Sequence, residues 1–169
     1  MQAYDWPVRF KLLYEKALQQ YREGHRDSET LFDAGERRFL ESIGARPIEV
    51  YDYVEDAAGI DWGTALLITA VRRDYFLVVQ GGVASSRRLS MTDFPAKDAE
   101  LDGIPWLPRL ILKAKLRLRG EMPQDMMYCC GGDRRFLQQY NIHPADFLRF
   151  TWSVDGDEAK TLENVRGQS

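Results

Sequence analysis

The sequence predicts a mainly helical α+β fold, in which two pseudo-repeated helical units pack together and a small antiparallel β-hairpin or three-stranded meander is inserted between them. The strongest observation is a repeat. The run Gly35-Glu36-Arg37-Arg38-Phe39-Leu40, followed by Pro47, returns as Gly132-Asp133-Arg134-Arg135-Phe136-Leu137, followed by Pro144 at the same spacing. Such self-similarity indicates a duplicated supersecondary unit. Apolar residues at helical spacing in both copies, and a β-prone stretch between them, complete the prediction.

We expect a single domain over residues 1–169, because this length suits one compact core. Within it we place repeat units at about 6–58 and 104–154, a β insert at about 64–92 and a polar tail at 155–169. The charged share of 29% and the apolar share of 44% are typical of a globular protein.

The composition argues against several classes of partner. The net charge of -3 makes a nucleic-acid backbone a poor main ligand for the whole chain. The longest uncharged apolar stretch, 65–71, is far shorter than the ~20 residues of a membrane-spanning helix, so we expect no membrane. The N-terminus lacks the apolar core of a secretory signal, and the only cysteines are the adjacent Cys129 and Cys130. We therefore expect free thiols and a reducing, cytoplasmic location.

The first unit is predicted to contain three helices. Residues 10–21 carry apolar side chains at the spacing of one helical face, and Gly24 ends that helix. Asp33 and Glu36 have the spacing of a capping box and begin the next helix, which ends near Gly44. Pro47 suits the first turn of the third helix.

The second unit repeats the same signals with different residues. We expect Asp133 to cap the repeated helix, and Asn141 to replace Gly44 at the left-handed position after it. Pro144 then begins the following helix, as Pro47 does in the first copy.

The segment 112–119 alternates apolar and basic residues like a half-buried strand, but its strong helix formers and its place before the repeat favour a helix. On this helix Leu112 and Leu116 lie opposite the main apolar face. A helix with two apolar faces is sandwiched, either between the two copies or at a subunit interface. Leu112 and Leu116 are therefore candidates for homodimer formation.

Between the copies, Tyr75 to Val79 is a β-prone run, Gly81-Gly82 indicates a turn, and Arg87 to Met91 suits a return strand. Residues 65–71 are either a third strand or a helix that begins at Asp61, and periodicity does not decide between the two.

Two helices joined by a short turn, present twice, also match a helix-turn-helix for DNA. The helix that would enter the groove carries Glu49, Asp52, Glu55 and Asp56 and no basic residue from 47 to 58. A groove-inserted helix meets phosphates, so this charge argues against DNA and favours a packed helical hairpin.

The arginine pair of the second copy points to an anion site. Arg134 and Arg135 fall in the first turn of a helix, where the macrodipole disfavours cations unless an anion is close. A glycine step, helix-terminal amides and two guanidinium groups together suit a phosphate or carboxylate. In the alternative interpretation Asp33, Glu36 and Asp133 supply the anion themselves, as intramolecular pairs that brace the turn.

Cys129 and Cys130 precede the same helix, whose dipole favours a thiolate nucleophile. His143 or Asp133 would then be the general base of a small-molecule enzyme, although buried, inert thiols explain the same residues. Adjacent cysteines do not have the spacing of a zinc site, so we expect no metal, and nothing indicates a cofactor.

Arg109, Lys113 and Arg117 form a basic stripe at helical spacing, with no acidic residue from 105 to 120. A solvated helix face is the simpler interpretation of this stripe, and an RNA or an acidic protein is the alternative partner.

The second half of the chain resembles a bacterial family, domain-of-unknown-function family 5069. The residues that carry the resemblance are Trp106-Leu107-Pro108-Arg109, Lys113-Ala114-Lys115, Gly120, Tyr128, Cys130, Asp133-Arg134, Phe136-Leu137, Ile142 and Phe147-Leu148. The match spans roughly 103–153, and the first half is similar to a longer subgroup through the run 71–77. The resemblance implies a fold and no activity, cofactor or catalytic residue.

Polar positions of this motif converge on the helix terminus that suits an anion. With Arg135 they make the ligand-binding set that we expect: Arg109, Lys113, Tyr128, Cys130, Asp133, Arg134 and Arg135. The sequence therefore favours a non-catalytic binding or regulatory module for a small anionic ligand. The alternatives are an enzyme with Cys130 or Cys129 as nucleophile, and a homo-oligomeric interaction protein.

Overall fold

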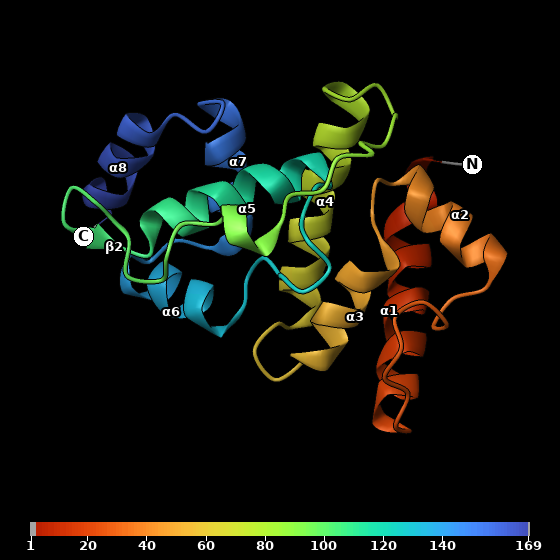
Figure 1. Ribbon diagram of the computed structural model, residues 1–169. Helices are drawn as coiled ribbons and strands as arrows, with labels where there is room; N and C mark the ends of the chain where they lie inside the picture. The colour runs from red at the N-terminus through yellow and green to blue at the C-terminus, as the bar shows by residue number, and fades with distance from the viewer. Residues whose placement is uncertain (1–2, 169) are drawn as a thin grey trace. The chain divides into compact units, whose positions relative to one another are not determined.

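A computed structural model describes residues 3–168 of the chain. It is mainly helical, with one small antiparallel sheet of two strands (Figure 1). The chain forms two compact units, and the division falls between Ala84 and Ser85. Each unit is described by itself.

The first unit contains a short 3-10 helix, Ala3–Asp5, and the helices α1 (Trp6–Arg22), α2 (Ala34–Ser42), α3 (Pro47–Glu55) and α4 (Trp62–Val78). α1 packs against α3 and α4 (Figure 1). Its buried face carries Phe10, Leu13, Tyr14 and Ala17, which lie within the predicted helix.

The capping box at the start of α2 is confirmed. The Asp33 carboxylate accepts hydrogen bonds from the backbone amides of Gly35 and Glu36 at 2.8 and 2.9 Å, and the Glu36 carboxylate accepts from the Asp33 amide at 2.9 Å. Gly44 has a φ of +70°, and a Cβ there would lie 2.6 Å from the ring of Phe76. Only glycine fits both the backbone and the contact.

The second unit begins with a 3-10 helix, Met91–Asp93, and the strands β1 (Glu100–Leu101) and β2 (Ile104–Pro105), which pair antiparallel. The helices α5 (Leu107–Arg119), α6 (Gly131–Gln139), α7 (Pro144–Ser153) and α8 (Glu158–Gly167) follow. α5 packs against α7 and α8. The polar tail predicted from residue 155 thus contains a helix, whose first turn is capped by the Asp157 carboxylate.

One predicted cap is wrong. Asp133 does not cap α6, because Cys130 is the N-cap residue and Gly131 and Gly132 already belong to the helix. Asp133 is the third residue of α6 and occupies the place that Glu36 has in α2. Asn141 does take the left-handed conformation, with a φ of +51°, and Pro144 begins α7 as expected.

The predicted β insert at 64–92 is not confirmed. Asp61 accepts a hydrogen bond from the Thr64 amide at 2.7 Å and begins α4, which continues through the β-prone run Tyr75 to Val79. The helix buries Ala65, Ile68, Thr69, Arg72 and Phe76, and this helical spacing outweighs the local β propensity. Gly81 and Gly82 form the expected turn with positive φ, but residues 87–91 are not a strand.

The second apolar face of α5 packs within its own unit. Leu116 is 2% exposed and lies in a small cluster with Phe94, Met122 and Met126, against which Leu112 also packs. The connecting segments on either side of α5 therefore contact this second apolar face, on which Leu116 is buried and Leu112 is partly buried. None of the helices within residues 3–168 is both long and apolar enough to cross a membrane.

Candidate functional site

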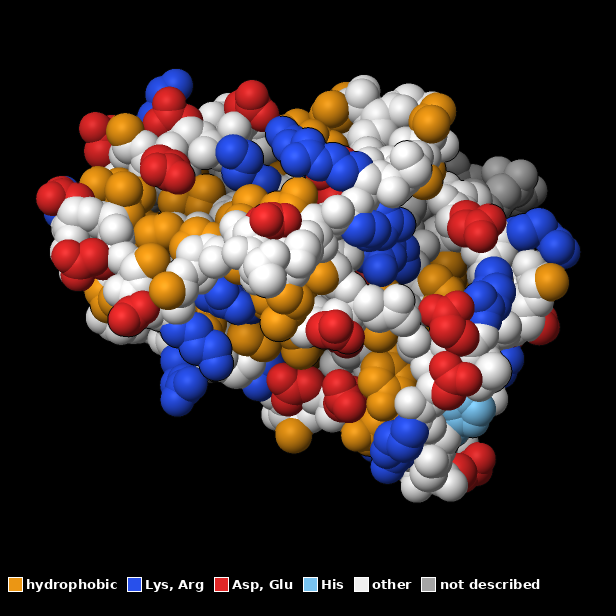
Figure 2. Space-filling view, viewed as in Figure 1, with side chains coloured by type: hydrophobic (Ala, Val, Ile, Leu, Met, Phe, Trp, Pro, Cys, Tyr) orange, Lys and Arg blue, Asp and Glu red, His pale blue; other side chains and the backbone are white. Residues whose placement is uncertain are grey.

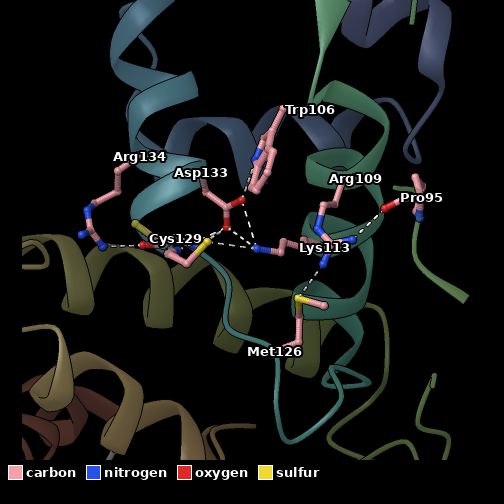
Figure 3. Close-up of polar contacts among 9 residues, drawn as sticks. Pro95, Trp106, Arg109, Lys113, Met126, Cys129, Asp133 and Arg134 are labelled. Carbon is pink, nitrogen blue, oxygen red and sulfur yellow. Dashed lines mark hydrogen bonds and ion pairs between the residues drawn. The ribbon is translucent and has the colours of Figure 1, made fainter. Parts of the chain in front are cut away.

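The carboxylate of Asp133 is the centre of a buried polar cluster in the second unit (Figure 3). Its Oδ1 atom accepts hydrogen bonds from the indole N–H of Trp106 at 2.9 Å and from the ammonium of Lys113 at 3.1 Å. Its Oδ2 atom accepts from Lys113 at 2.9 Å and from the backbone amides of Cys129 and Cys130 at 3.0 and 3.3 Å. The Lys113 and Asp133 side chains are 2% and 0% exposed.

Local structure brings these groups together. Lys113 lies on the buried face of α5, and Asp133 lies in the first turn of α6, where its carboxylate reaches back to the amides of Cys129 and Cys130, which precede the helix. Trp106, the N-cap of α5, has a φ of +71°, which is unusual for a bulky residue. Its ring covers Gly132 so closely that a Cβ on Gly132 would lie 2.5 Å from it.

The two cysteines have different environments. The Sγ atom of Cys130 lies 3.2 Å from the ammonium of Lys113, and its side chain is partly exposed. Cys129 is fully buried, and its φ of +71° directs its amide toward Asp133. Of the two thiols, only that of Cys130 is accessible, and it shares the Lys113 ammonium with the Asp133 carboxylate.

The other predicted ligand-binding residues mostly hold backbone segments in place. Arg109 donates to the Pro95 carbonyl at 2.7 Å, Tyr128 donates to the Pro144 carbonyl at 2.8 Å, and Arg134 donates to the Cys129 carbonyl at 2.8 Å. Arg135 is exposed. Of the predicted set, the structure therefore brings together Lys113, Cys130 and Asp133.

His143 caps α7, where its Nδ1 atom accepts a hydrogen bond from the Ala145 amide at 3.2 Å. This hydrogen bond requires an unprotonated Nδ1. His143 also lines a cavity of about 250 Å³ beside Asp146, Phe150 and Asn164. Within residues 3–168 no group of three or more His, Cys, Asp or Glu side chains could hold a metal ion.

The basic stripe on α5 is not a solvated face, which corrects that interpretation. Lys113 and Arg117 are both buried, and the aliphatic part of Lys115 packs under Gly156, where a Cβ would lie 2.6 Å from it. On the face shown in Figure 2, basic and acidic side chains are interspersed. The basic side chains of α5 therefore mainly contribute to packing and to pairing within the unit.

The first unit contains a matching ion pair. Lys16 on α1 lies 2.6 Å from the Oε2 atom of Glu36, and the two residues are 20 positions apart, as Lys113 and Asp133 are. The arginine contact also recurs, because Arg37 donates to the Phe32 carbonyl at 3.1 Å and Arg134 donates to the Cys129 carbonyl. We call two residues corresponding when they are as far apart in the sequence as Pro47 and Pro144.

The corresponding pairs differ in exposure. The Lys16 and Glu36 side chains are 38% and 22% exposed, whereas Lys113 and Asp133 are shielded. The residue that corresponds to Trp106 is Arg9, whose guanidinium lies over the ring of Phe39 at 4.3 Å. No side chain of α1 covers Gly35, since a Cβ there would meet only atoms of Asp33 and Arg38 within the described part of the chain.

An open groove of about 390 Å³ lies over Gly35, between α1 and α2. Its lining residues are Arg9, Leu12, Leu13, Asp33, Gly35, Glu36 and Phe39. The walls are largely apolar, and the two carboxylates stand at the N-terminus of α2. The pKa of Asp33 is lowered from its ordinary value of 3.8, chiefly by the hydrogen bond from the Glu36 amide. Asp33 therefore keeps its negative charge at neutral pH, while the charge of Glu36 is paired with Lys16.

Neither the Lys16–Glu36 pair nor the groove beside it is among the sites predicted from the sequence. The signal was present, because Lys16 and Lys113 stand at corresponding positions before the repeated run. Trp106 was recognised only as part of a motif, and its partner Asp133 was assigned to a cap. No family model, curated protein or solved structure matches this chain.

Proposed function

We propose that this protein is a non-catalytic binding module, and that its ligand binds in the groove between α1 and α2 of the first unit. The supporting observation is the contrast at Gly35 and Gly132. The Trp106 ring occupies the space over Gly132, whereas the space over Gly35 is part of an open groove.

The proposal treats the two units as copies of one four-helix arrangement. In each unit a long first helix packs against the third and fourth helices. α2 and α6 are both nine residues long and begin at corresponding positions, and both following helices begin at a proline. The recurrence of the lysine–carboxylate pair and of the arginine–carbonyl contact at corresponding positions also supports a duplication.

This proposal moves the binding site away from the N-terminus of α6. An external anion there would have to replace the Asp133 carboxylate, which already accepts the amides of Cys129 and Cys130 and the ammonium of Lys113. Asp133 thus already binds a cation within the chain, which is Lys113, whereas the intramolecular interpretation expected it to pair with the arginines of the turn. We place the protein in a reducing cytoplasm, where Cys129 and Cys130 remain free thiols.

A peptide-display selection against the full chain tests this function. Enriched peptides should shift the backbone NMR resonances of Gly35, Glu36 and Phe39, because these residues line the groove. Leu12 lines the groove and is 61% exposed, so Leu12→Glu should abolish binding while leaving the fold intact. Peptides that bind without shifting these resonances, or that bind Leu12→Glu equally well, would contradict the assignment.

A second candidate function is a small-molecule enzyme with Cys130 as nucleophile. The observation that favours it is the 3.2 Å distance between the Lys113 ammonium and the Cys130 Sγ. Treatment of the folded protein with iodoacetamide, followed by peptide mass spectrometry, should then modify Cys130 while buried Cys129 is protected. If Cys130 reacts no faster than Cys129, this candidate fails.

A further inference from the structure

We infer that the groove accepts the tryptophan side chain of a partner polypeptide, whose indole ring lies over Gly35 and donates its N–H to the Oε1 atom of Glu36. This inference rests on the proposed function, because it names the partner of the same groove. The second unit contains an equivalent contact within the chain, because the ring of Trp106 covers Gly132 and its N–H donates to Asp133.

The second unit shows what the space over the glycine fits. The Trp106 ring lies directly on Gly132, and its Nε1 donates to Asp133 Oδ1 at 2.9 Å. An indole is suited to this place because it has a flat apolar body and a single N–H donor at its edge. The corresponding residues of the first unit, Gly35 and Glu36, line the groove.

The hydrogen bonds of Glu36 leave one carboxylate oxygen open. The Lys16 ammonium and the Asp33 amide both donate to Oε2, at 2.6 and 2.9 Å. Oε1 has no hydrogen-bond partner among residues 3–168. In the second unit, the oxygen that binds the backbone amides of Cys129 and Cys130 is likewise distinct from the one that binds the indole. Glu36 Oε1 therefore matches the acceptor that Trp106 uses, and its negative charge complements an N–H donor.

The surroundings of the groove favour a polypeptide over a free indole. Tyr4, Val8 and Leu12 are spaced four residues apart along the start of the chain and are 93%, 64% and 61% exposed. Leu12 lines the groove, and Val8 lies one turn before it on the same face of α1. A single indole ring fills only the space over Gly35 and leaves the side chains of Tyr4, Val8 and Leu12 uncovered. Apolar residues that flank the tryptophan in a polypeptide would cover them.

The test uses tryptophan-containing peptides from the selection described above and the full chain. Replacement of their tryptophan by 1-methyltryptophan keeps the ring and removes the N–H. This should weaken binding and raise the dissociation constant by about tenfold or more. N-acetyltryptophanamide should bind far more weakly than the peptides. If it binds as tightly as they do, the partner is a small molecule and the polypeptide assignment is wrong.

Gly35→Ala supplies the matched variant. A Cβ at Gly132 would lie 2.5 Å from the Trp106 ring, so a Cβ at Gly35 should occupy the place of the bound ring and abolish peptide binding. The variant should fold, because its nearest neighbour is an oxygen of the exposed Asp33 side chain at 3.2 Å. The inference fails and the proposed function stands if selected peptides shift the resonances of Gly35 and Glu36 but lack tryptophan. The same holds if 1-methyltryptophan leaves the dissociation constant of such peptides unchanged. If no peptide shifts these resonances, the proposed function itself fails.

Discussion

The Nζ atom of Lys113 lies 2.9 Å from Oδ2 of Asp133, and both side chains are almost completely shielded from solvent. The corresponding pair, Lys16 and Glu36, has a shorter distance of 2.6 Å but is partly exposed. The same interaction therefore occurs twice in one chain, in two dielectric environments. Its energetic consequences should differ accordingly.

Removal of one partner should be costly only in the buried pair. Lys113→Met leaves the Asp133 charge buried without its cation, so we expect a loss of about 3–5 kcal/mol in the free energy of unfolding. Lys16→Met should cost less than about 1 kcal/mol, because water screens the exposed pair. Urea denaturation, with hydrogen exchange to report each unit separately, measures both. Equal costs would contradict the difference in burial.

The two glycines that precede the carboxylates should respond differently to the same substitution. Gly132→Ala drives a Cβ into the Trp106 ring and should destabilise the second unit by about 1–3 kcal/mol. Gly35→Ala should change the stability of the first unit by less than about 1 kcal/mol, since only the Asp33 side chain has to adjust. Thermal unfolding of the two variants compares them directly, and a Gly132→Ala protein as stable as Gly35→Ala would contradict the close packing of the ring.

Asp33 should make the stability of the first unit sensitive to acid. Its pKa is lowered in the folded protein, chiefly by the Glu36 amide, so its charge stabilises the fold above its unfolded pKa. This contribution is lost as the pH falls through the lowered pKa, below about pH 4. Asp33→Asn retains a capping side chain without the charge, so its stability deficit should shrink between pH 7 and pH 3. A deficit that is the same at both pH values would show that the charge is irrelevant.

Leu116 should behave as a core residue. Leu116→Ala removes a side chain packed against Phe94, Met122 and Met126 and should cost about 2–5 kcal/mol. Leu67→Ala, at a position that is 41% exposed on α4, should change stability by less than about 1 kcal/mol.

Sedimentation of Leu112→Ala should give the same molecular mass as the wild type, because Leu112 packs within its own unit. A change in mass would restore the dimer interpretation.

The helices α2 and α6 were predictable because their signals are local. Asp33 and Glu36 cap α2 through side-chain contacts three residues apart, and Gly44 and Asn141 each follow a helix in the left-handed conformation. α4 was harder to predict. Its buried face includes Arg72, whose charge hides the helical spacing, while the valines near its end favour a strand. Packing along the whole of α4 therefore outweighs the strand preference of the short run at its end.

The candidate site was predictable only in part. Lys113, Cys130 and Asp133 were each identified, but their contact spans two helices, and no local spacing shows that a lysine will be buried. The groove of the first unit was not predictable, because its walls come from two helices and no local motif marks it.

The attachment of Trp106 to the helix that it caps has a further consequence. A group tethered beside its own acceptor has an effective concentration in the millimolar range or above, which a dilute competitor does not match. The space over Gly132 is therefore permanently occupied by the chain itself, in the manner of an intramolecular inhibitor. Within the described part of the first unit no ring is tethered over Gly35 in this way, because Arg9 lies over Phe39 instead.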